Sequence, residues 1–302
     1  MSPDPEAASK RPPSIFTAAL IKEENANADQ RSHKAHCPSR LSDRELQGAD
    51  DLQPYFDKHG IDAVVVPMGC KAEHYAAFLK LVFKLSNIHG ALVTMPHKVT
   101  TVALLDEVMT TAQVAGSCNA IRLGSGGKLI GDDGEGFMRG VLRKGRILMG
   151  ARVLVVGSGG VGSAIVASLA KAGVAEIAIF DADAAAMNRL AERLRAHYPA
   201  LKIEVGSRDP AGFDVVVNAT PLGMKDDDPL SMDVARLLPS TFVGEVVMKR
   251  EITPFLAAAR ARGCAIQVGT DMLFEQIPAY LEFFGLRTTT PDELRVVTQI
   301  SY

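Results

Sequence analysis

The chain has 302 residues, of which 47% are hydrophobic and 23% charged, with a formal net charge of −2 and a pI of about 6.4. This length accommodates two domains of ordinary size, and the composition is typical of a soluble globular protein. The near-neutral charge excludes the basic surface that a nucleic-acid or anionic-membrane partner requires, and no apolar run reaches the roughly 18 residues that span a bilayer.

Residues 1–52 differ from the rest because they are rich in Pro, Ala, Asn, Ser and charged residues, with one short apolar patch, SIFTAALI, at residues 14–21. We expect this segment to be poorly ordered or weakly helical. The N-terminus lacks the apolar core of a signal peptide. The four cysteines, Cys37, Cys70, Cys118 and Cys264, show no C-x-x-C spacing, so we expect a reduced cytoplasmic protein with no metal site.

From about residue 55, strand patterns alternate with helix patterns. In the first half we expect strands over residues 61–68 and 90–95 and helices over residues 72–86 and 100–108. Two strands that flank a helix predict a βαβ unit with a parallel pairing. In the second half, the expected elements are a strand, glycine turn and helix over 151–173, strands over 176–183, 214–221, 242–248 and 265–269, and helices over 184–198 and 270–285.

The alternation predicts an α/β fold whose second half is a Rossmann-type doubly wound sheet. Helix 184–198 carries Arg189, Arg193 and Arg195, which we place on its solvent-facing side. Asp106 and Glu107 are expected to be solvated residues of the helix over 100–108.

Gly157, Gly159 and Gly162 form a G-x-G-x-x-G pattern that follows an apolar strand and opens a helix. In that context the pattern predicts a dinucleotide-binding turn, where the backbone approaches a pyrophosphate at a helix N-terminus. A glycine-rich turn without a ligand is the alternative. The expected cofactor contacts of the turn are Gly157, Ser158, Gly159, Gly160, Val161 and Gly162.

Asp181 ends the second strand of this unit, 19 residues after Gly162. A carboxylate at that point accepts hydrogen bonds from ribose hydroxyls and repels a 2′-phosphate. Because Ala182 follows it rather than an arginine, the sequence predicts that NAD is preferred over NADP. Asp183 is expected to be the N-cap of the next helix.

Several motifs occur in the order found in one family, and together they are more specific than any one of them. With these motifs the chain resembles shikimate dehydrogenases, and more closely their shikimate/quinate dehydrogenase-like branch, from about residue 53 to the end. The motifs are VTMPHK (93–98), AGSCNA (115–120), GDDGEGF (131–137), the glycine turn, NATPLGM (218–224) and GTDMLFEQ (269–276).

The resemblance implies that Lys98 works beside an aspartate at the substrate. Lys98 follows Pro96 at the end of a strand, and from this stretch alone a solvated turn lysine is the alternative. Alignment on the D-G-x-G half of the family's G-x-N-T-D-G-x-G stretch makes Asp133 the partner. Alignment on the first glycine would favour Asp132, because the stretch is two residues shorter here.

The resemblance also implies substrate contacts from Thr94, Asn119 and Gln276. Further cofactor contacts are implied for a second set of residues: Asn218, Ala219, Thr220, Met248 and Gly269. For Thr220, a bond within its own loop is an equal alternative. We expect His97 to be a surface turn residue and Cys118 to be a small core residue rather than a nucleophile.

One departure from the family concerns residues 1–52, which contain no S-x-S-P turn after a strand, although CPSRLSD (37–43) contains serines. In the family such a serine pair binds the substrate carboxylate. We therefore expect the first strand of the substrate domain's sheet to be absent or replaced.

The resemblance implies an NAD(P)-dependent oxidoreductase that interconverts shikimate, or a quinate-like cyclic hydroxy acid, and its 3-dehydro form. The alternative is a catalytically weak nucleotide-binding protein of the same fold. The expected ligands are NAD and a small molecule, in a monomer or homodimer. The expected domains are a divergent segment (1–52), a substrate-binding α/β domain (53–145), an NAD(P)-binding Rossmann domain (146–268) and C-terminal helices packing back on the substrate domain (269–302).

Overall fold

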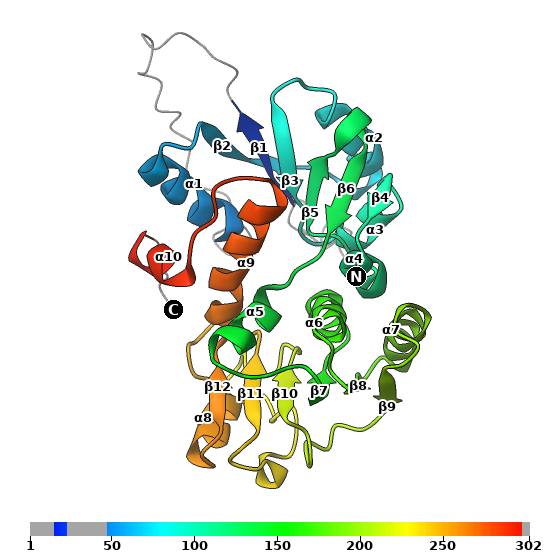
Figure 1. The fold of residues 1–302 in the computed structure, drawn as a ribbon, viewed down its shortest axis with the longest axis vertical. Helices are drawn as coiled ribbons and strands as arrows, with labels where there is room; N and C mark the ends of the chain where they lie inside the picture. Colours follow the sequence, from blue (N-terminus) through cyan, green and yellow to red (C-terminus); the bar gives the residue numbers. More distant parts are fainter. Residues whose placement is uncertain (1–14, 23–46, 298–302) are drawn as a thin grey trace, which may run out of the picture.

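The structure is a computed structural model that describes residues 15–22 and 47–297, with the backbone course alone for 15–22, 47–51 and 297. Figure 1 shows two lobes, one above the other, each built around a six-stranded sheet. Helices alternate with most of the strands. The predicted α/β fold, with a doubly wound sheet in the second half, is confirmed.

The upper sheet is mixed, in the order β2-β1-β3-β5-β6-β4. Its strands are β1 (Ile15–Lys22), β2 (Ala63–Gly69), β3 (Ile88–Leu92), β4 (Glu107–Val108), β5 (Ala120–Leu123) and β6 (Leu129–Asp132). The helices of this part are α1 (Gln47–His59), α2 (Ala72–Val82), α3 (Lys98–Val102) and α4 (Thr110–Ala115), with a 3₁₀ turn η2 (Ser125–Gly127).

Strand β1 corrects two expectations. Residues 15–22 form a strand where none was expected, and β2 and β3 do not pair directly because β1 lies between them. Ala19 is opposite both Val66 and Ala91, and β1 runs antiparallel to both neighbours. A short apolar run suffices for a strand when two apolar neighbours supply its pairing, whatever the polarity of its flanks. The serines of residues 37–43 lie outside the described residues.

The helix expected over 100–108 is also corrected, because α3 ends at Val102 and residues 107–108 form β4. The Asp106 carboxylate accepts the Leu129 amide at 2.7 Å, and Glu107 pairs with Lys128 at 2.9 Å. Backbone pairing with β6, distant in sequence, thus overrides the local helical pattern. Both acidic residues are exposed, as expected.

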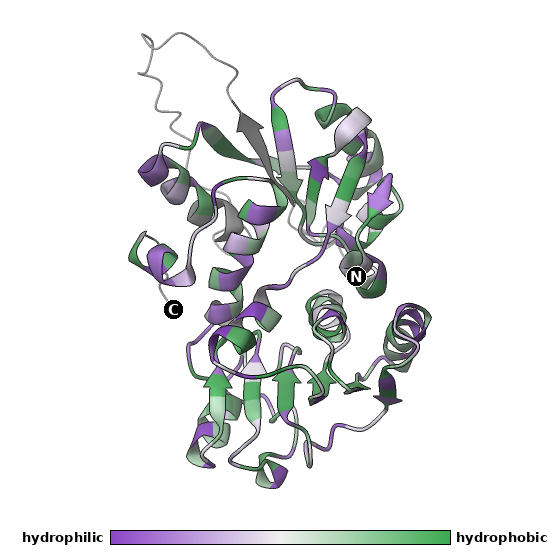
Figure 2. Ribbon diagram, viewed as in Figure 1, coloured by the Kyte–Doolittle hydropathy of each residue, from purple (hydrophilic) through white to green (hydrophobic). Residues whose placement is uncertain are grey.

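The lower sheet is entirely parallel, in the order β12-β11-β10-β7-β8-β9. Its strands are β7 (Arg152–Val156), β8 (Glu176–Phe180), β9 (Lys202–Val205), β10 (Val215–Asn218), β11 (Phe242–Glu245) and β12 (Ala265–Gln267). The central strands are hydrophobic on both faces (Figure 2), as expected when helices cover both sides. The helices are α6 (Gly160–Lys171), α7 (Ala184–His197) and α8 (Pro254–Ala261), with a 3₁₀ turn η3 (Val234–Arg236).

Helices α5 (Gly136–Arg143) and α9 (Gly269–Phe283) connect the lobes, and α10 (Pro291–Val297) packs against α9 and α1. Phe274, Ile277 and Leu281 of α9 are buried in one cluster with Tyr55 of α1 and Leu92 of β3. Helix α9 therefore begins beside the lower sheet and ends in the core of the upper lobe (Figure 1).

Candidate active site

The glycine turn after β7 combines two tight positions with two open ones. A Cβ on Gly162 would lie 2.0 Å from the Gly157 carbonyl oxygen, and one on Gly157 would lie 2.7 Å from the Ala219 carbonyl carbon. Gly157 also has a φ of 108°. At Gly159 and Gly160, by contrast, an added Cβ would meet nothing within 4 Å. The first pair lets strand and helix pack, and the second leaves the backbone open to an anion at the start of α6.

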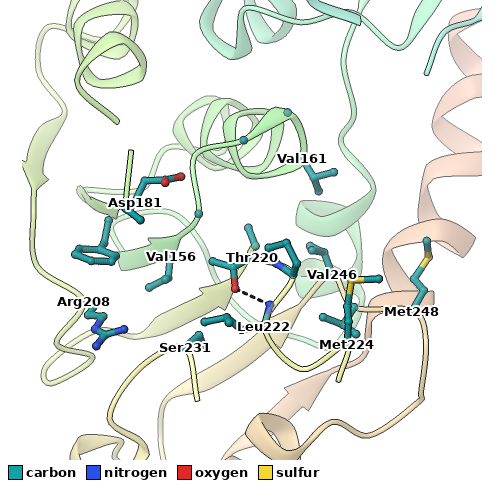
Figure 3. Close-up of a pocket in the computed structure, with 18 of the residues that line it drawn as sticks. Val156, Val161, Asp181, Arg208, Thr220, Leu222, Met224, Ser231, Val246 and Met248 are labelled. Atoms are coloured by element: carbon teal, nitrogen blue, oxygen red, sulfur yellow. Dashed lines mark hydrogen bonds between the residues drawn. The ribbon is translucent and has the colours of Figure 1, made fainter. Parts of the chain in front are cut away.

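A cavity of about 1040 Å³ lies over this turn and the carboxyl ends of β7, β8, β10 and β11 (Figure 3). We call it the cofactor cavity. Of the expected cofactor residues, it is lined by Gly157, Gly159, Gly160, Val161, Asp181, Ala219, Thr220 and Met248. Such a crevice at the carboxyl edge of a parallel sheet is where nucleotides bind in this class of fold.

The other expected cofactor residues lie behind the wall of this cavity. Ser158 is buried and donates to Asp181, and Gly162 is packed against the turn. Asn218 is buried and accepts the Thr220 hydroxyl at 2.6 Å. Gly269 packs against the loop after β11, where its Cβ would lie 2.2 Å from the Val247 carbonyl oxygen. These four residues shape the cavity rather than line it.

Asp181 is held by the glycine turn itself. One carboxylate oxygen accepts the amide and hydroxyl of Ser158, at 2.5 and 2.8 Å, and the other accepts the Asp183 amide at 2.9 Å. Burial raises the pKa of Asp181, but these hydrogen bonds outweigh burial and hold it below its usual value. The group is therefore an anion with fixed orientation at one end of the cavity. Asp183 is the N-cap of α7 and accepts the Ala186 amide, as expected.

Two residues near Asp181 refine the sequence interpretation. Thr220 bonds its own loop, since its hydroxyl donates to Asn218 and accepts the Leu222 amide at 3.1 Å, although it also lines the cavity (Figure 3). Arg208, which the sequence did not single out, lines the same end of the cavity, with its guanidinium carbon 5.6 Å from the centre of the Phe180 ring. It follows β9, a strand that no pattern predicted, so no local signal marked it.

A second cavity, of about 380 Å³, lies between the lobes, and we call it the substrate cavity. The five residues expected at the substrate all line it: Thr94, Lys98, Asn119, Asp133 and Gln276. The rest of its lining includes the apolar residues Phe137, Ile165, Met272 and Leu273, which the sequence did not identify. Val161 and Met248 line both cavities, so the two adjoin at these side chains.

Lys98 is the first residue of α3, and the residue before it anchors that helix. His97 was expected on the surface but is buried, so that expectation is wrong. Its ring stacks on Tyr75 with 4.1 Å between centroids, and its Nε2 lies 3.0 Å from the Cys70 carbonyl oxygen. Within residues 47–297, Lys98 forms no ion pair, which leaves its ammonium available to a substrate.

Two adjacent carboxylates end β6, and each is held by its own donors. Asp133 accepts the Ser117 hydroxyl and, at 2.9 Å, the Gly134 amide. Asp132 accepts the Thr111 hydroxyl, and burial raises its pKa. Asp133 lines the substrate cavity and Asp132 does not. The geometry therefore favours Asp133 as the neighbour of Lys98, although the two do not form an ion pair.

The remaining polar groups converge from separate elements. Gln276 of α9 accepts the Gly136 amide at 3.0 Å, and a Cβ on Gly134 would lie 2.6 Å from the Gln276 Oε1 and 3.4 Å from the Asn119 Nδ2. A side chain at 134 would therefore displace the Gln276 amide from its present position. Cys118 is buried, and burial together with the nearby Asp133 raises its pKa to about 12, which agrees with a core thiol rather than a nucleophile.

In the part of the chain that the structure describes, no three His, Cys, Asp or Glu side chains are grouped so that they could hold a metal ion. None of its helices is long and apolar enough to cross a membrane.

Comparison with known proteins identifies relatives of each lobe. The sequence profile described as shikimate dehydrogenase substrate binding domain matches residues 52–121, and the profile of the ThiF family matches residues 141–194. Shikimate dehydrogenase (NADP(+)) of Paracoccus denitrificans is 35% identical over 252 residues, which cover 80% of this chain and 87% of that protein.

Solved structures agree with this relationship. Quinate dehydrogenase from Corynebacterium glutamicum, in complex with NAD, is 26% identical with a TM-score of 0.73, covering 85% of this chain and 95% of that one. Shikimate 5-dehydrogenase from Listeria monocytogenes, in complex with shikimate and NAD, has a TM-score of 0.77 at 24% identity. The alignment covers 85% of this chain and 93% of the Listeria monocytogenes chain. At this identity the similarity supports the fold alone.

Proposed function

Because the chain belongs to the shikimate dehydrogenase family, we propose that it is an NAD(P)-dependent oxidoreductase that interconverts shikimate, or a quinate-like cyclic hydroxy acid, and its 3-dehydro form. The observation that carries the proposal is the junction of the two cavities at Val161 and Met248. At this junction a hydride can pass between a nucleotide on one side and an alcohol carbon on the other. The alternative of a weak nucleotide-binding protein has no support from the relatives.

Each polar residue of the substrate cavity has its own proposed role in the oxidation of an alcohol. The nicotinamide supplies the redox step when it is bound, by taking or giving hydride. Lys98 takes the proton from the hydroxyl oxygen during oxidation and returns it during reduction. Asp133 faces the same cavity and orients the lysine, while Thr94, Asn119 and Gln276 bind the other oxygens of the ring. Each of these roles is a proposal.

We further propose that NAD is preferred over NADP, although the Paracoccus denitrificans relative is named for NADP(+). The support is Asp181, whose ionised carboxylate stands at the end of the cofactor cavity and is followed by Ala182. An anion there accepts ribose hydroxyls and repels a 2′-phosphate. Arg208 lies at the same end and limits the preference, because a guanidinium attracts phosphate.

We also propose a cytoplasmic monomer or homodimer with a small-molecule substrate and no nucleic-acid or membrane partner. The support is the near-neutral charge of the chain.

The test is NADH formation, followed at 340 nm, with shikimate and with quinate, beside a direct measurement of NADH affinity. We expect turnover with at least one of the two acids. Tight NADH binding without turnover of either acid, with NAD or with NADP, would contradict the proposed function.

A further inference from the structure

Helix α4 belongs to the upper lobe but contacts α6 and α7 of the lower lobe (Figure 1). It ends at Gly116, whose φ of 68° turns the chain into residues 117–119. This turn carries Ser117 toward the end of β6 and Asn119 into the substrate cavity. The turn after α4 is therefore a point where the lower lobe can influence the polar wall of the active site.

Ser117 is the side chain of this turn that holds the proposed catalytic carboxylate. Its residue exposure is 1%, that of Asp133 is 2%, and its hydroxyl donates to the Asp133 Oδ2. The Gly134 amide bonds the other oxygen, so both carboxylate oxygens have a donor. Thr111 makes the equivalent bond to Asp132, which lies outside the substrate cavity. The pair of hydroxyls thus provides an internal comparison.

Arg193 of α7 holds the end of α4 from across the lobe boundary. Its Nε donates to the Val114 carbonyl at 2.7 Å, and its Nη2 donates to the Ala115 carbonyl at 3.0 Å. These carbonyls belong to the last turn of α4. The carbonyls of a last helical turn have no hydrogen-bond donor within their own helix. We expected Arg193 to face solvent, but it is half-buried, and burial lowers its pKa.

The turn and the guanidinium are in direct contact. A Cβ on Gly116 would lie 3.0 Å from the Arg193 Cζ, so a larger residue at 116 would displace one or the other. Arg193 therefore fixes the position of Gly116, and the next residue in the chain is Ser117. A planar group that bonds two carbonyls at once fixes this turn more strictly than a lysine ammonium could.

We propose that Arg193 and Ser117 form one positioning unit for Asp133, in which a helix of the nucleotide-binding lobe fixes a carboxylate of the substrate cavity. Neither Arg193 nor Ser117 lines that cavity, so both act through Asp133 and are positioning residues. The inference rests on the proposed function, since it assigns a purpose to the orientation of Asp133. Small displacements of such a group are costly to the rate.

The test compares Ser117→Ala and Arg193→Lys with two matched controls. Thr111→Val removes the equivalent hydroxyl from Asp132, and Arg195→Ala removes an exposed arginine of the same helix. We expect Ser117→Ala to lower kcat by roughly 10-fold or more, as for a lost hydrogen bond to a charged group, and Arg193→Lys to lower it by a few-fold. The controls should stay within about two-fold, and the NADH dissociation constant should be unchanged throughout.

Two further variants separate positioning from general destabilisation. Ser117→Thr keeps the hydroxyl and should retain most of kcat. The double variant combines Arg193→Lys with Ser117→Ala. Its kcat should be close to that of Ser117→Ala alone, because Arg193 acts on Asp133 through Ser117. If Ser117→Ala does not fold, Arg193→Lys and Ser117→Thr still carry the test.

The outcomes are distinct. The inference is overturned if the parent is active and both Ser117→Ala and Arg193→Lys are as active as the controls. This outcome leaves the proposed function intact. Fully additive losses, or an equal loss in Thr111→Val, also overturn it. A parent that binds NADH but oxidises neither acid overturns the proposed function, and the inference falls with it.

Discussion

The two cavities of this protein are built from different parts of the chain. The cofactor cavity lies at the carboxyl ends of parallel strands of the lower sheet and includes Gly157, Gly159 and Gly160 of the glycine turn. The substrate cavity is formed by residues of α3, the loop after β6, α5, α6, α9 and the turn after α4, which are distant in sequence and come from both lobes. The cofactor cavity is thus contained in the lower lobe, whereas the substrate cavity depends on assembly of both lobes.

This difference has a functional consequence. Substitutions at the substrate cavity should change turnover with little effect on nucleotide affinity, and substitutions at the cofactor cavity should do the reverse. Val161 and Met248 are the exceptions, because they line both cavities.

The largest expected effect follows from Lys98→Ala. Acid–base groups contribute roughly 10²–10⁴ in rate, and this variant should lose that much of kcat while its NADH dissociation constant stays that of the parent. Steady-state rates and a fluorescence titration with NADH measure the two quantities. Retention of more than about a tenth of the parent activity would be inconsistent with the acid–base role.

Asp133→Asn should follow, with a loss of about 10² in kcat/KM, because an amide cannot carry the charge that orients the lysine. Asp132→Asn is the matched control, since Asp132 neighbours Asp133 but lies outside the substrate cavity. We expect the control to lose less than about 10-fold. The opposite ranking would make Asp132 the partner of Lys98 and reverse the alignment of the shortened loop.

A third prediction concerns stability of the cofactor side. Glu245 ends β11 with 0% exposure, its Oε1 has no hydrogen-bond partner, and burial raises its pKa from 4.5 to about 7. Since the native state holds this proton more tightly than the unfolded chain, the contribution of Glu245 to stability should be complete below pH 4.5 and should be lost as pH rises through about 7. The difference is roughly 3 kcal/mol, about a hundred-fold in the folding equilibrium.

Denaturant unfolding at several pH values between 4.5 and 8 checks this. Glu245→Gln should remove most of this pH dependence and stabilise the protein at neutral pH, whereas Glu251→Gln, at an exposed position, should not. An unchanged pH dependence in Glu245→Gln would show that the buried carboxyl does not carry this effect.

The smallest expected effect is on cofactor choice. Repulsion between Asp181 and a 2′-phosphate at a partly exposed site is worth about 1–4 kcal/mol, or roughly 5- to 900-fold in affinity. Within this range we expect NADH to bind at least about 10-fold more tightly than NADPH. Asp181→Asn should reduce that preference, and Arg208→Ala should increase it by removing the cation at the same end of the cavity. The dissociation constants of both reduced cofactors decide the matter, and equal constants in the parent would contradict the prediction.

The sequence predicted the strand, glycine turn and helix of the lower lobe because their signals are local. The glycine spacing, the apolar strand before it and Asp181 at the next strand end all lie within 30 residues, and their geometry is fixed by backbone sterics. The residues of the substrate cavity were found through motif resemblance. The structure brings them around one cavity, and their roles stay predictions.

Errors occurred where distant residues decide the outcome. Residues 107–108 are a strand because β6 pairs with them, and His97 is buried because Tyr75 stacks on it. Arg193 faces α4 rather than solvent because the Val114 and Ala115 carbonyls lie opposite. Strand β1 joins the upper sheet between β2 and β3 although its flanks in the sequence are polar. Periodicity along the chain reports which face is apolar, but not which partner will cover it.

The most direct test of the account is hydride transfer within the protein itself. Enzyme saturated with NAD is mixed rapidly with shikimate, or quinate, carrying hydrogen or deuterium on the carbon to be oxidised, and absorbance is followed at 340 nm. The account predicts a rise in absorbance with the protiated acid, a slower rise with the deuterated one, and a rise at least about 100-fold slower with Lys98→Ala. Absence of any rise with either acid, in protein that binds NADH, would contradict it.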